Sequence, residues 1–397
     1  MKRIGIHILP LLVLCCGWAA VRSALAQSHS PEPPPATCTA KFAYGGNAAE
    51  IPADFIDHLV FVPARVDQGE PSLFQLNTAA PTSSIDPGRA RALGLGRVTT
   101  PVLNLSGVDI AFSQFAESSR PDFAARYGRE YRGTLGNDFL ASVVADIDYA
   151  RETMRLYDPS VYKYSGRGKA LRVTFVDGVP VVKSKMKVGG RSIDADFVVN
   201  TALDAPVLIY DKYAQAHQLS LPKSISAASM PIEGAENDAI GRLDRFQIGP
   251  YQVQASLVVF SKDAPPVSHD SKLAGEIGAQ MLRRFGVVFD YSRREIYLAP
   301  NSEFNTDDFE DMSGLTVIAG GPNLKRFEIT EVRPNTPGAD AGLRKGDIIE
   351  GVNGDAAADM SLMDLRKLFH QLGPPYDLVI TRNAKSFHAA LQMHRLL

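Results

Sequence analysis

The stretch FVVNTALDAP at residues 197–206 decides how this 397-residue chain is interpreted. Apolar residues lead into a short polar turn, Asn200-Thr201-Ala202, and a second apolar segment follows. SLFQLNTAAPTSSIDPGRARALGL at 72–95 aligns with ADFVVNTALDAPVLIYDKYAQAHQL at 195–219, so that Asn77-Thr78-Ala79 matches the later turn. Each copy predicts a strand, the Asn-Thr-Ala turn, another strand and a short helix.

A second pair of segments repeats further along the chain in the same order. GTLGNDFLASVVADIDYARETMRLYDP at 133–159 aligns with GEIGAQMLRRFGVVFDYSRREIYLAP at 275–300. Both begin with Gly-x-apolar-Gly, continue through a helical turn, and end with Asp-Tyr and a final strand. Four matched segments in the same register indicate an internal duplication.

Short strands separated by Gly, Pro, Asn and Asp fill the region from 41 to 300, and this pattern predicts an all-β barrel or sandwich. Helical patches are expected at 86–95 and 211–219. The fold class predicted for the whole chain is mainly β, with two β-barrel lobes and a small α+β domain. The clearest predicted strands are HLVFVPARV (58–66), SLFQL (72–76), VPVVKSKMKV (179–188), VQASLVVF (253–260) and REIYLAP (294–300).

Charge and motif content exclude several classes of function. The 42 basic and 44 acidic residues give a net charge of -2. The chain therefore lacks the excess of basic residues that would indicate nucleic acid as a partner. The eight His residues show no metal-binding spacing, and the chain has neither a nucleophile elbow nor a Gly-rich phosphate loop. We therefore expect no metal and no cofactor.

Residues 1–26 have the features of a secretory signal peptide. A basic start precedes an apolar stretch to Val21, and an A-x-A site predicts cleavage after Ala26. Lipidation at Cys15 or Cys16 is a disfavoured alternative, because the residue before each is large. We expect an exported protein of the bacterial envelope, periplasmic or secreted, with no stable membrane span after cleavage. Residues 27–40 then predict a Pro-rich linker.

The double pattern in residues 41–300 resembles the single-chain, two-lobed form of the retropepsin-like and pepsin-like aspartic proteases. Leu135-Gly136 and Ile277-Gly278 match the family's apolar-apolar-Gly segments, and the two Asp-Tyr pairs match its closing strands. The resemblance implies two aspartic-protease-like lobes, at 41–162 and 163–300. In that family each lobe contributes one Asp-Thr-Gly turn, and the two carboxylates hold one water.

This chain departs from the family at its catalytic residues. Where the family has Asp-Thr-Gly, it has Asn77-Thr78-Ala79 and Asn200-Thr201-Ala202. The mechanism needs one carboxylate to take a proton from water and a second, protonated carboxyl to hydrogen-bond the substrate. An amide cannot accept that proton at any useful pH. The pattern predicts a degenerate catalytic dyad, while the resemblance implies that Thr78 and Thr201 still hold the lobes together.

Two other interpretations of the turns remain. An Asn at a strand end is often a turn former that satisfies nearby backbone groups. A displaced carboxylate could also take over the chemistry, and Asp86, Asp196 and Asp204 lie near the turns in sequence. We interpret all three as surface turn residues.

The C-terminal part has a different pattern. RPNTPGADAGLRKGDIIEGVNGDAA at 333–357 resembles the PDZ family, and a PDZ domain is predicted for 314–397 after an acidic linker at 301–313. A helix from Leu362 to Leu372 is expected behind a capping box that begins at Ser361. The resemblance implies that extended peptides or protein C-termini bind at Gly314, Leu315, Thr316 and Val317, with the helix as the other wall.

Three functions follow from these observations. The first is a catalytically impaired pseudoprotease that binds peptides or proteins through its lobes and its PDZ domain. The second is an active aspartic-type endopeptidase whose PDZ domain guides substrate capture. The third is an envelope scaffold that uses only the PDZ domain.

Overall fold

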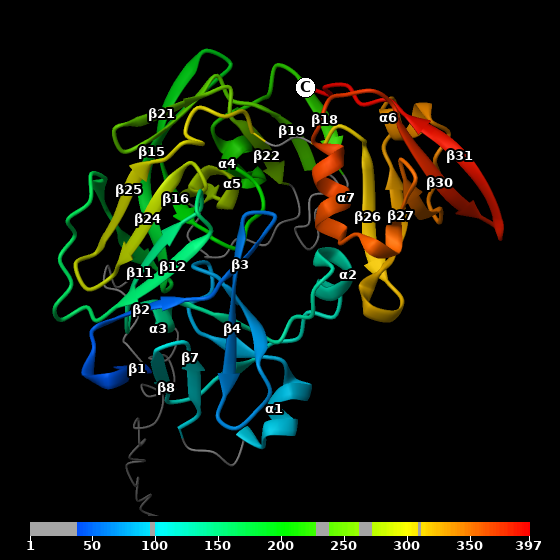
Figure 1. Cartoon of the computed structure of the whole chain (residues 1–397). Helices are drawn as coiled ribbons and strands as arrows, with labels where there is room; N and C mark the ends of the chain where they lie inside the picture. The colour runs from blue at the N-terminus through cyan, green and yellow to red at the C-terminus, as the bar shows by residue number, and fades with distance from the viewer. Residues whose placement is uncertain (1–37, 96–99, 228–237, 262–271, 309–310) are drawn as a thin grey trace, which may run out of the picture.

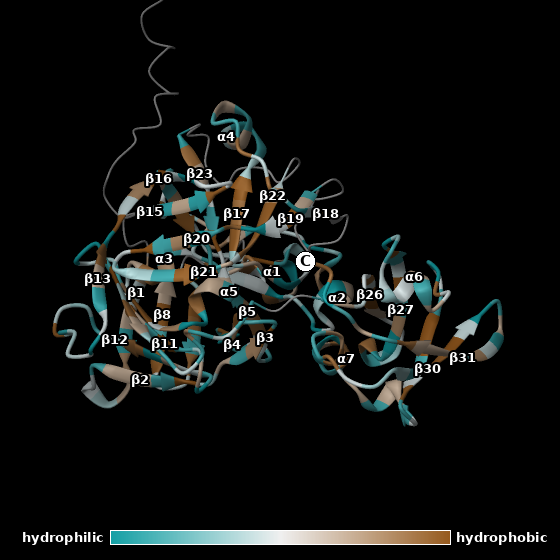
Figure 2. Ribbon diagram, turned by 90° about the horizontal axis from the view of Figure 1, so that it is seen from above, coloured by the Kyte–Doolittle hydropathy of each residue, from teal (hydrophilic) through white to brown (hydrophobic). Residues whose placement is uncertain are grey.

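The computed structural model describes residues 38–95, 100–227, 238–261, 272–308 and 311–397, and these are mainly β (Figure 1). Two lobes share one side of the molecule, and the C-terminal domain lies beside them in both views (Figures 1 and 2). The predicted signal peptide and most of the Pro-rich linker lie outside the described residues. Within the described residues, no helix has the length and hydropathy needed to cross a membrane.

Lobe 1 is built on a nine-stranded sheet. Its first strand begins at Cys38, which is buried, so the predicted linker overlaps β1 by three residues. Helix α1 (Pro87–Leu93) has Asp86 as its N-cap and Gly94 in the left-handed region after its end. The strands are β1 (Cys38–Phe42), β3 (Asp54–Ile56), β4 (Leu59–Val66), β5 (Ser72–Leu76), β6 (Ser84–Ile85), β7 (Val102–Leu105), β8 (Val108–Phe112), β9 (Ala116–Glu117) and β10 (Gly133–Leu135).

Lobe 2 is built on a ten-stranded sheet. Its longest hairpin, β15–β16, turns at Gly189-Gly190, where both residues have positive φ as a tight two-residue turn requires. The strands are β14 (Thr174–Val176), β15 (Val179–Val188), β16 (Arg191–Val199), β17 (Val207–Tyr210), β18 (Ser224–Ala227), β19 (Asp238–Arg242), β20 (Arg245–Ile248), β21 (Tyr251–Gln254), β22 (Leu257–Ser261) and β23 (Leu273–Ile277).

The two lobes have the same strand arrangement around their Asn-Thr-Ala turns. In lobe 1, β10 lies parallel to β5 and antiparallel to β6, between the two strands that the turn connects. In lobe 2, β23 lies parallel to β16 and antiparallel to β17. Leu135 pairs with Leu76 and Ile277 with Val199, immediately before each turn. The duplication seen in the sequence is thus also a duplication of topology.

A six-stranded sheet joins the lobes, because β11 of the first half pairs with β24 of the second. One hydrophobic core runs through both lobes and this sheet. Short helices α3 (Asn137–Leu140) and α5 (Ala279–Leu282) follow the two Gly-x-apolar-Gly segments. The joining strands are β2 (Ala48–Ile51), β11 (Val144–Asp148), β12 (Thr153–Tyr157), β13 (Lys169–Arg172), β24 (Phe285–Asp290) and β25 (Glu295–Pro300).

Two predicted elements have different bounds in the structure. The predicted strand at 253–260 is divided between β21 and β22, because Ala255 has a φ of 50° and the chain turns there. The helix predicted for 211–219 is α4 (Asp211–Ala216), and Gln218 beyond it also has positive φ.

The C-terminal domain has its own hydrophobic core around a six-stranded sheet. Helix α7 (Leu362–Phe369) begins with the predicted capping box of Ser361 and Asp364, but it ends before Leu372, which is 57% exposed. The remaining elements of this domain are β26 (Leu315–Gly320), β27 (Arg326–Val332), α6 (Pro337–Asp340), β28 (Ile348–Val352), β29 (Asp355–Ala356), β30 (Tyr376–Arg382) and β31 (Lys385–Leu391), with 3-10 turns η3 (Pro322–Leu324) and η4 (Ala357–Asp359). The 3-10 turn η1 (Ala43–Gly45) lies between β1 and β2.

The acidic segment after β25 is held against lobe 2. Arg284 forms an ion pair with Asp308 over 2.6 Å, and both side chains are almost fully buried. Arg283 pairs with Glu303 over 2.6 Å. These contacts tie residues 303–308 of the predicted linker to the lobe, so only its last residues lead into the PDZ domain.

Candidate functional site

Thr78 and Thr201 form reciprocal hydrogen bonds where the two lobes meet. The Thr78 amide donates to Oγ1 of Thr201 over 3.1 Å, and the Thr201 amide donates to Oγ1 of Thr78 over 3.0 Å. Each hydroxyl also donates to a carbonyl of the opposite lobe, that of Val199 at 2.5 Å and that of Leu76 at 2.8 Å. Both threonines are fully buried. This reciprocal set brings the two Asn-Thr-Ala turns together at the lobe interface.

The two asparagines have equivalent places in this arrangement. The Asn77 amide donates to the Leu135 carbonyl over 2.9 Å, and the Asn200 amide donates to the Ile277 carbonyl over 2.8 Å. Each side-chain Oδ1 accepts a 2.8 Å hydrogen bond from the alanine amide two residues on. Each amide oxygen therefore stabilises its own turn.

Glycine is required where each turn meets the segment that follows β10 or β23. A Cβ added at Gly136 would lie 2.7 Å from the Ala80 carbonyl oxygen, and one at Gly278 would lie 2.1 Å from the Ala205 carbonyl oxygen. Both contacts are with backbone, which cannot move aside cheaply. The Gly of the apolar-apolar-Gly pattern thus allows the two backbones to approach.

Glu276 is a carboxyl that the sequence interpretation missed. Nδ2 of Asn200 donates to its Oε2 over 2.5 Å, and the Tyr210 hydroxyl donates to its Oε1 over 2.8 Å. Its exposed fraction is 4%. Burial raises the pKa of Glu276, while the hydrogen bonds from Asn200 and Tyr210 act in the opposite direction. Lobe 2 therefore has a carboxyl at its turn, with both oxygens already engaged.

Lobe 1 has no equivalent of this carboxyl. The residue at the matching place in Gly-x-apolar-Gly is Thr134, and its hydroxyl lies 2.9 Å from the Tyr131 hydroxyl. The signal was present in the sequence as Glu276 within an otherwise apolar segment, GEIG. A buried carboxyl needs hydrogen-bond partners, and for Glu276 these are Asn200 and Tyr210.

The three carboxylates considered as substitutes have three separate roles. Asp86 caps α1 by accepting from the Arg89 amide. Asp196 lies within β16, where it pairs with Lys183 over 3.1 Å at an exposed position. Neither has a described contact with the asparagines. Asp86 lies in the connection between β6 and α1, whereas Asp196 belongs to a strand and not to a turn.

Asp204 also differs from the predicted surface residue. It is partly buried and accepts from Nε2 of Gln280 over 3.1 Å. Burial and the nearby carboxylate of Asp57 raise its pKa to about 7, although Gln280 and Arg366 act in the opposite direction. Asp204 thus belongs to a group of polar residues where lobe 1, lobe 2 and the PDZ domain meet.

The predicted carboxylate-binding loop of the PDZ domain has internal partners for its first amides. Oδ1 of Asp311 accepts from the amides of Ser313 at 2.8 Å and Gly314 at 3.1 Å. The Leu315 amide donates to Oγ of Ser313 over 3.0 Å. Gly314 has a φ of 72°, and Thr316 and Val317 continue into β26. The loop is therefore formed, with side chains of the preceding residues bonded to its amides.

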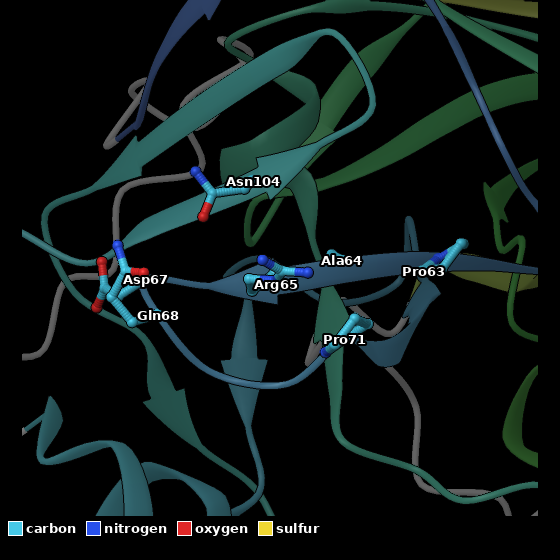
Figure 3. Close-up of a pocket in the computed structure, with 7 residues that line it drawn as sticks. All are labelled: Pro63, Ala64, Arg65, Asp67, Gln68, Pro71 and Asn104. Carbon is cyan, nitrogen blue, oxygen red and sulfur yellow. The ribbon is translucent and has the colours of Figure 1, made fainter.

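A separate hollow of about 350 Å³ opens on lobe 1 (Figure 3). None of its lining residues belongs to an Asn-Thr-Ala turn or to the PDZ domain. Among the residues that the structure describes, no group of three or more His, Cys, Asp or Glu side chains could hold a metal ion. The hollow is lined by Pro63, Ala64, Arg65, Asp67, Gln68, Pro71 and Asn104.

Comparison with known proteins gives three findings. The family described as PDZ domain matches residues 328–382, and no curated protein matches the chain. A crystal structure of an aspartic proteinase from Irpex lacteus is 13% identical, with a TM-score of 0.41, over 66% of this chain and 99% of that one. A crystal structure of the HtrA3 PDZ domain bound to a phage-derived ligand (FGRWV) is 23% identical, with a TM-score of 0.19, over 20% of this chain and 82% of that one.

The duplicated topology and the interlocked threonines define residues 38–300 as an aspartic-protease-like, two-lobed fold. The family match and the separate core define the C-terminal unit. The chain is an aspartic-protease-like fold followed by a PDZ domain.

Proposed function

We propose that this chain is an exported pseudoprotease that binds extended peptides or protein C-termini without cleaving them. The observation that carries the proposal is the hydrogen bonding of Asn77 and Asn200, whose side-chain oxygens are fixed by their own turns. Water activation in an aspartic protease needs a carboxylate that can take a proton. Two amides at the dyad positions cannot supply it.

Glu276 favours a second candidate, an acid peptidase that works through one carboxyl. Its raised pKa would suit an acid, and it contacts Asn200 directly. Yet each of its oxygens already accepts a hydrogen bond, and its side chain is almost fully buried. A water would have to displace Asn200 or Tyr210 before it could reach the carboxyl, so we place this candidate second.

Cleavage of unfolded casein between pH 3 and pH 7 separates the two functions. We expect no cleavage by the protein, by its Glu276→Gln variant, or in the presence of pepstatin. Cleavage that disappears in Glu276→Gln would reject the pseudoprotease and establish the acid peptidase. Glu50→Gln is the matched control, because Glu50 is an exposed carboxylate whose partner Arg155 is also exposed.

Export is part of the proposal and rests on the pattern of residues 1–26. It predicts that the protein purified from an envelope or culture fraction begins at Gln27. N-terminal sequencing and cell fractionation test this directly. A cytoplasmic protein that retains Met1 would contradict export while leaving the pseudoprotease proposal in place.

A further inference from the structure

Strand β26 and helix α7 are neighbours in the PDZ domain, and we call the region between them the PDZ groove, because a PDZ domain adds a peptide to a sheet edge. Strand β26 is the terminal strand of its sheet, with β27 on one side and its other edge toward α7. At one end of the groove, the Met312 amide donates to the Phe369 carbonyl over 3.0 Å. A PDZ domain binds an extended peptide at such an edge. Whatever lies between β26 and α7 therefore competes with a peptide.

A segment of lobe 1 reaches one end of this groove. Helix α2 (Phe123–Tyr127) contacts β26 and ends at Gly128, and both views place it beside β26 and α7 (Figures 1 and 2). A Cβ added at Gly128 would lie 3.1 Å from Cβ of Leu362 and 3.9 Å from Cβ of Ala319. Leu362 begins α7 and Ala319 is near the end of β26, so Gly128 lies against both elements at this end of the groove.

The Arg366 side chain bonds helix α7 to lobe 1 beside the groove. Its guanidinium forms an ion pair with Asp57 over 2.7 Å, and it also donates to the Arg126 carbonyl over 2.6 Å. The same group lies 3.4 Å from the Val317 carbonyl on β26. One α7 side chain thus bonds to lobe 1 and approaches the strand edge to which a peptide would bond.

Apolar contacts reinforce the same junction. Phe123 and Tyr127 of α2 belong to a small buried cluster with Phe61, and Met363 of α7 packs against it. The Asp57 amide also lies 3.5 Å from Sδ of Met363. Polar and apolar contacts therefore join the same face of α7 to lobe 1.

We infer that α2 and Gly128 are a built-in occupant of the PDZ groove, which a peptide C-terminus enters only after lobe 1 separates from α7. This inference rests on the proposed peptide-binding function and adds its regulation.

A disulfide across the groove tests the closure. Gly128→Cys with Ala319→Cys, in a Cys38→Ala background without residues 1–26, places the two Cβ atoms near the 3.8 Å typical of disulfides. We expect rapid cross-linking of this pair under mild oxidation. The control pair Gly128→Cys with Lys385→Cys, at the exposed tip of β31, should not cross-link within the same molecule. Because Gly128 has a φ of 64°, a side chain there carries strain, and Gly128→Ala measures its effect on stability. Absence of the first cross-link from a pair that unfolds at the same temperature as the unaltered protein would overturn the inference.

Peptide binding tests the regulation. The probe is a pool of fluorescein-labelled hexapeptides with a free, apolar C-terminal residue. We expect the oxidised pair to bind the pool at least tenfold more weakly than the same protein after reduction. Asp57→Asn should raise the affinity several-fold, whereas Asp54→Asn, an exposed change in the neighbouring strand, should not. Equal affinities of the oxidised and reduced forms would overturn the inference.

The two measurements also separate this inference from the proposed function. Rapid, specific cross-linking together with no peptide binding by any form, including Asp57→Asn, would support the closed groove and reject peptide capture. Binding that ignores the cross-link would support peptide capture at another surface and reject the closed groove.

Discussion

Nδ2 of Asn200 lies 2.5 Å from Oε2 of Glu276, so the side-chain amide of this turn is hydrogen-bonded to a buried carboxyl of its own lobe. Asn77 in the other lobe has the same turn geometry, but its neighbour at the corresponding place is Thr134. The duplicated site is therefore asymmetric. An Asn can donate to a carboxyl at any pH, whereas an Asp at the same position could donate only while it holds a proton.

Asn200→Asp should make stability fall more steeply as the pH rises. The new carboxyl would lie beside Glu276, and two carboxyls at this distance share one proton because both cannot ionise together. The folded variant then holds a proton that the unfolded chain releases, so its stability falls between pH 5 and pH 8. We expect an additional loss of about 1–2 kcal/mol relative to the unaltered protein, measured by urea denaturation at both pH values.

Asn77→Asp is the matched control for that experiment. Its side-chain oxygen accepts from the Ala79 amide, and the residue in the place of Glu276 is an uncharged threonine. It should therefore keep the pH dependence of the unaltered protein. Equal slopes for Asn77→Asp and Asn200→Asp would contradict the assigned contact with Glu276.

Thr201→Ala should destabilise the lobes by about 2–3 kcal/mol. The hydroxyl donates to the Leu76 carbonyl and accepts from the Thr78 amide, and its loss leaves two buried groups without partners. Thr201→Ser keeps the hydroxyl and loses one methyl group, which should cost only about 1 kcal/mol. Chemical denaturation followed by circular dichroism measures both. A serine variant as unstable as the alanine variant would show that packing, and not the hydrogen bonds, dominates.

Sequence comparison predicted the duplication, the equivalence of Asn77 and Asn200 and the capping box of α7, because each depends on local pattern and on residues repeated in register. It missed the role of Glu276, because a single charged residue in an apolar segment does not name its partner. It also could not place α2 at the PDZ groove. That contact joins Gly128 to Leu362 across more than two hundred residues, and no periodicity encodes such packing.

Asp204→Asn should make the free energy of unfolding fall less steeply as the pH rises. Burial and Asp57 raise the pKa of Asp204 to about 7 from 3.8, so the folded protein retains a proton that the unfolded chain releases between these values. The contribution of Asp204 therefore lowers stability as the pH rises from about 4 to about 7. Relative to the unaltered protein, Asp204→Asn should gain stability across this window and show no further gain above it.

The Asp204→Asn variant must be compared with the unaltered protein, because titration of His58 changes the free energy of unfolding in the opposite direction. Burial lowers its pKa to about 3 from 6.5, so the unfolded chain binds more protons between these values and stability rises with pH. Its contribution cancels when the two proteins are subtracted. Calorimetry at half-unit intervals from pH 4 to pH 8 gives the difference, and a difference that is flat with pH would refute the raised pKa.

Asp308→Asn should destabilise the protein by about 3 kcal/mol, because it leaves the guanidinium of Arg284 buried without its charged partner. Asp308 also accepts from the Leu257 amide over 2.5 Å, so the change weakens the attachment of the acidic segment to β22. Asp307→Asn is the matched control one residue earlier. Asp307 pairs with Arg395 at an exposed site, and its replacement should cost less than about 0.5 kcal/mol. Urea denaturation distinguishes the two variants, and equal small effects would mean that the segment before the PDZ domain is not anchored by its buried ion pair.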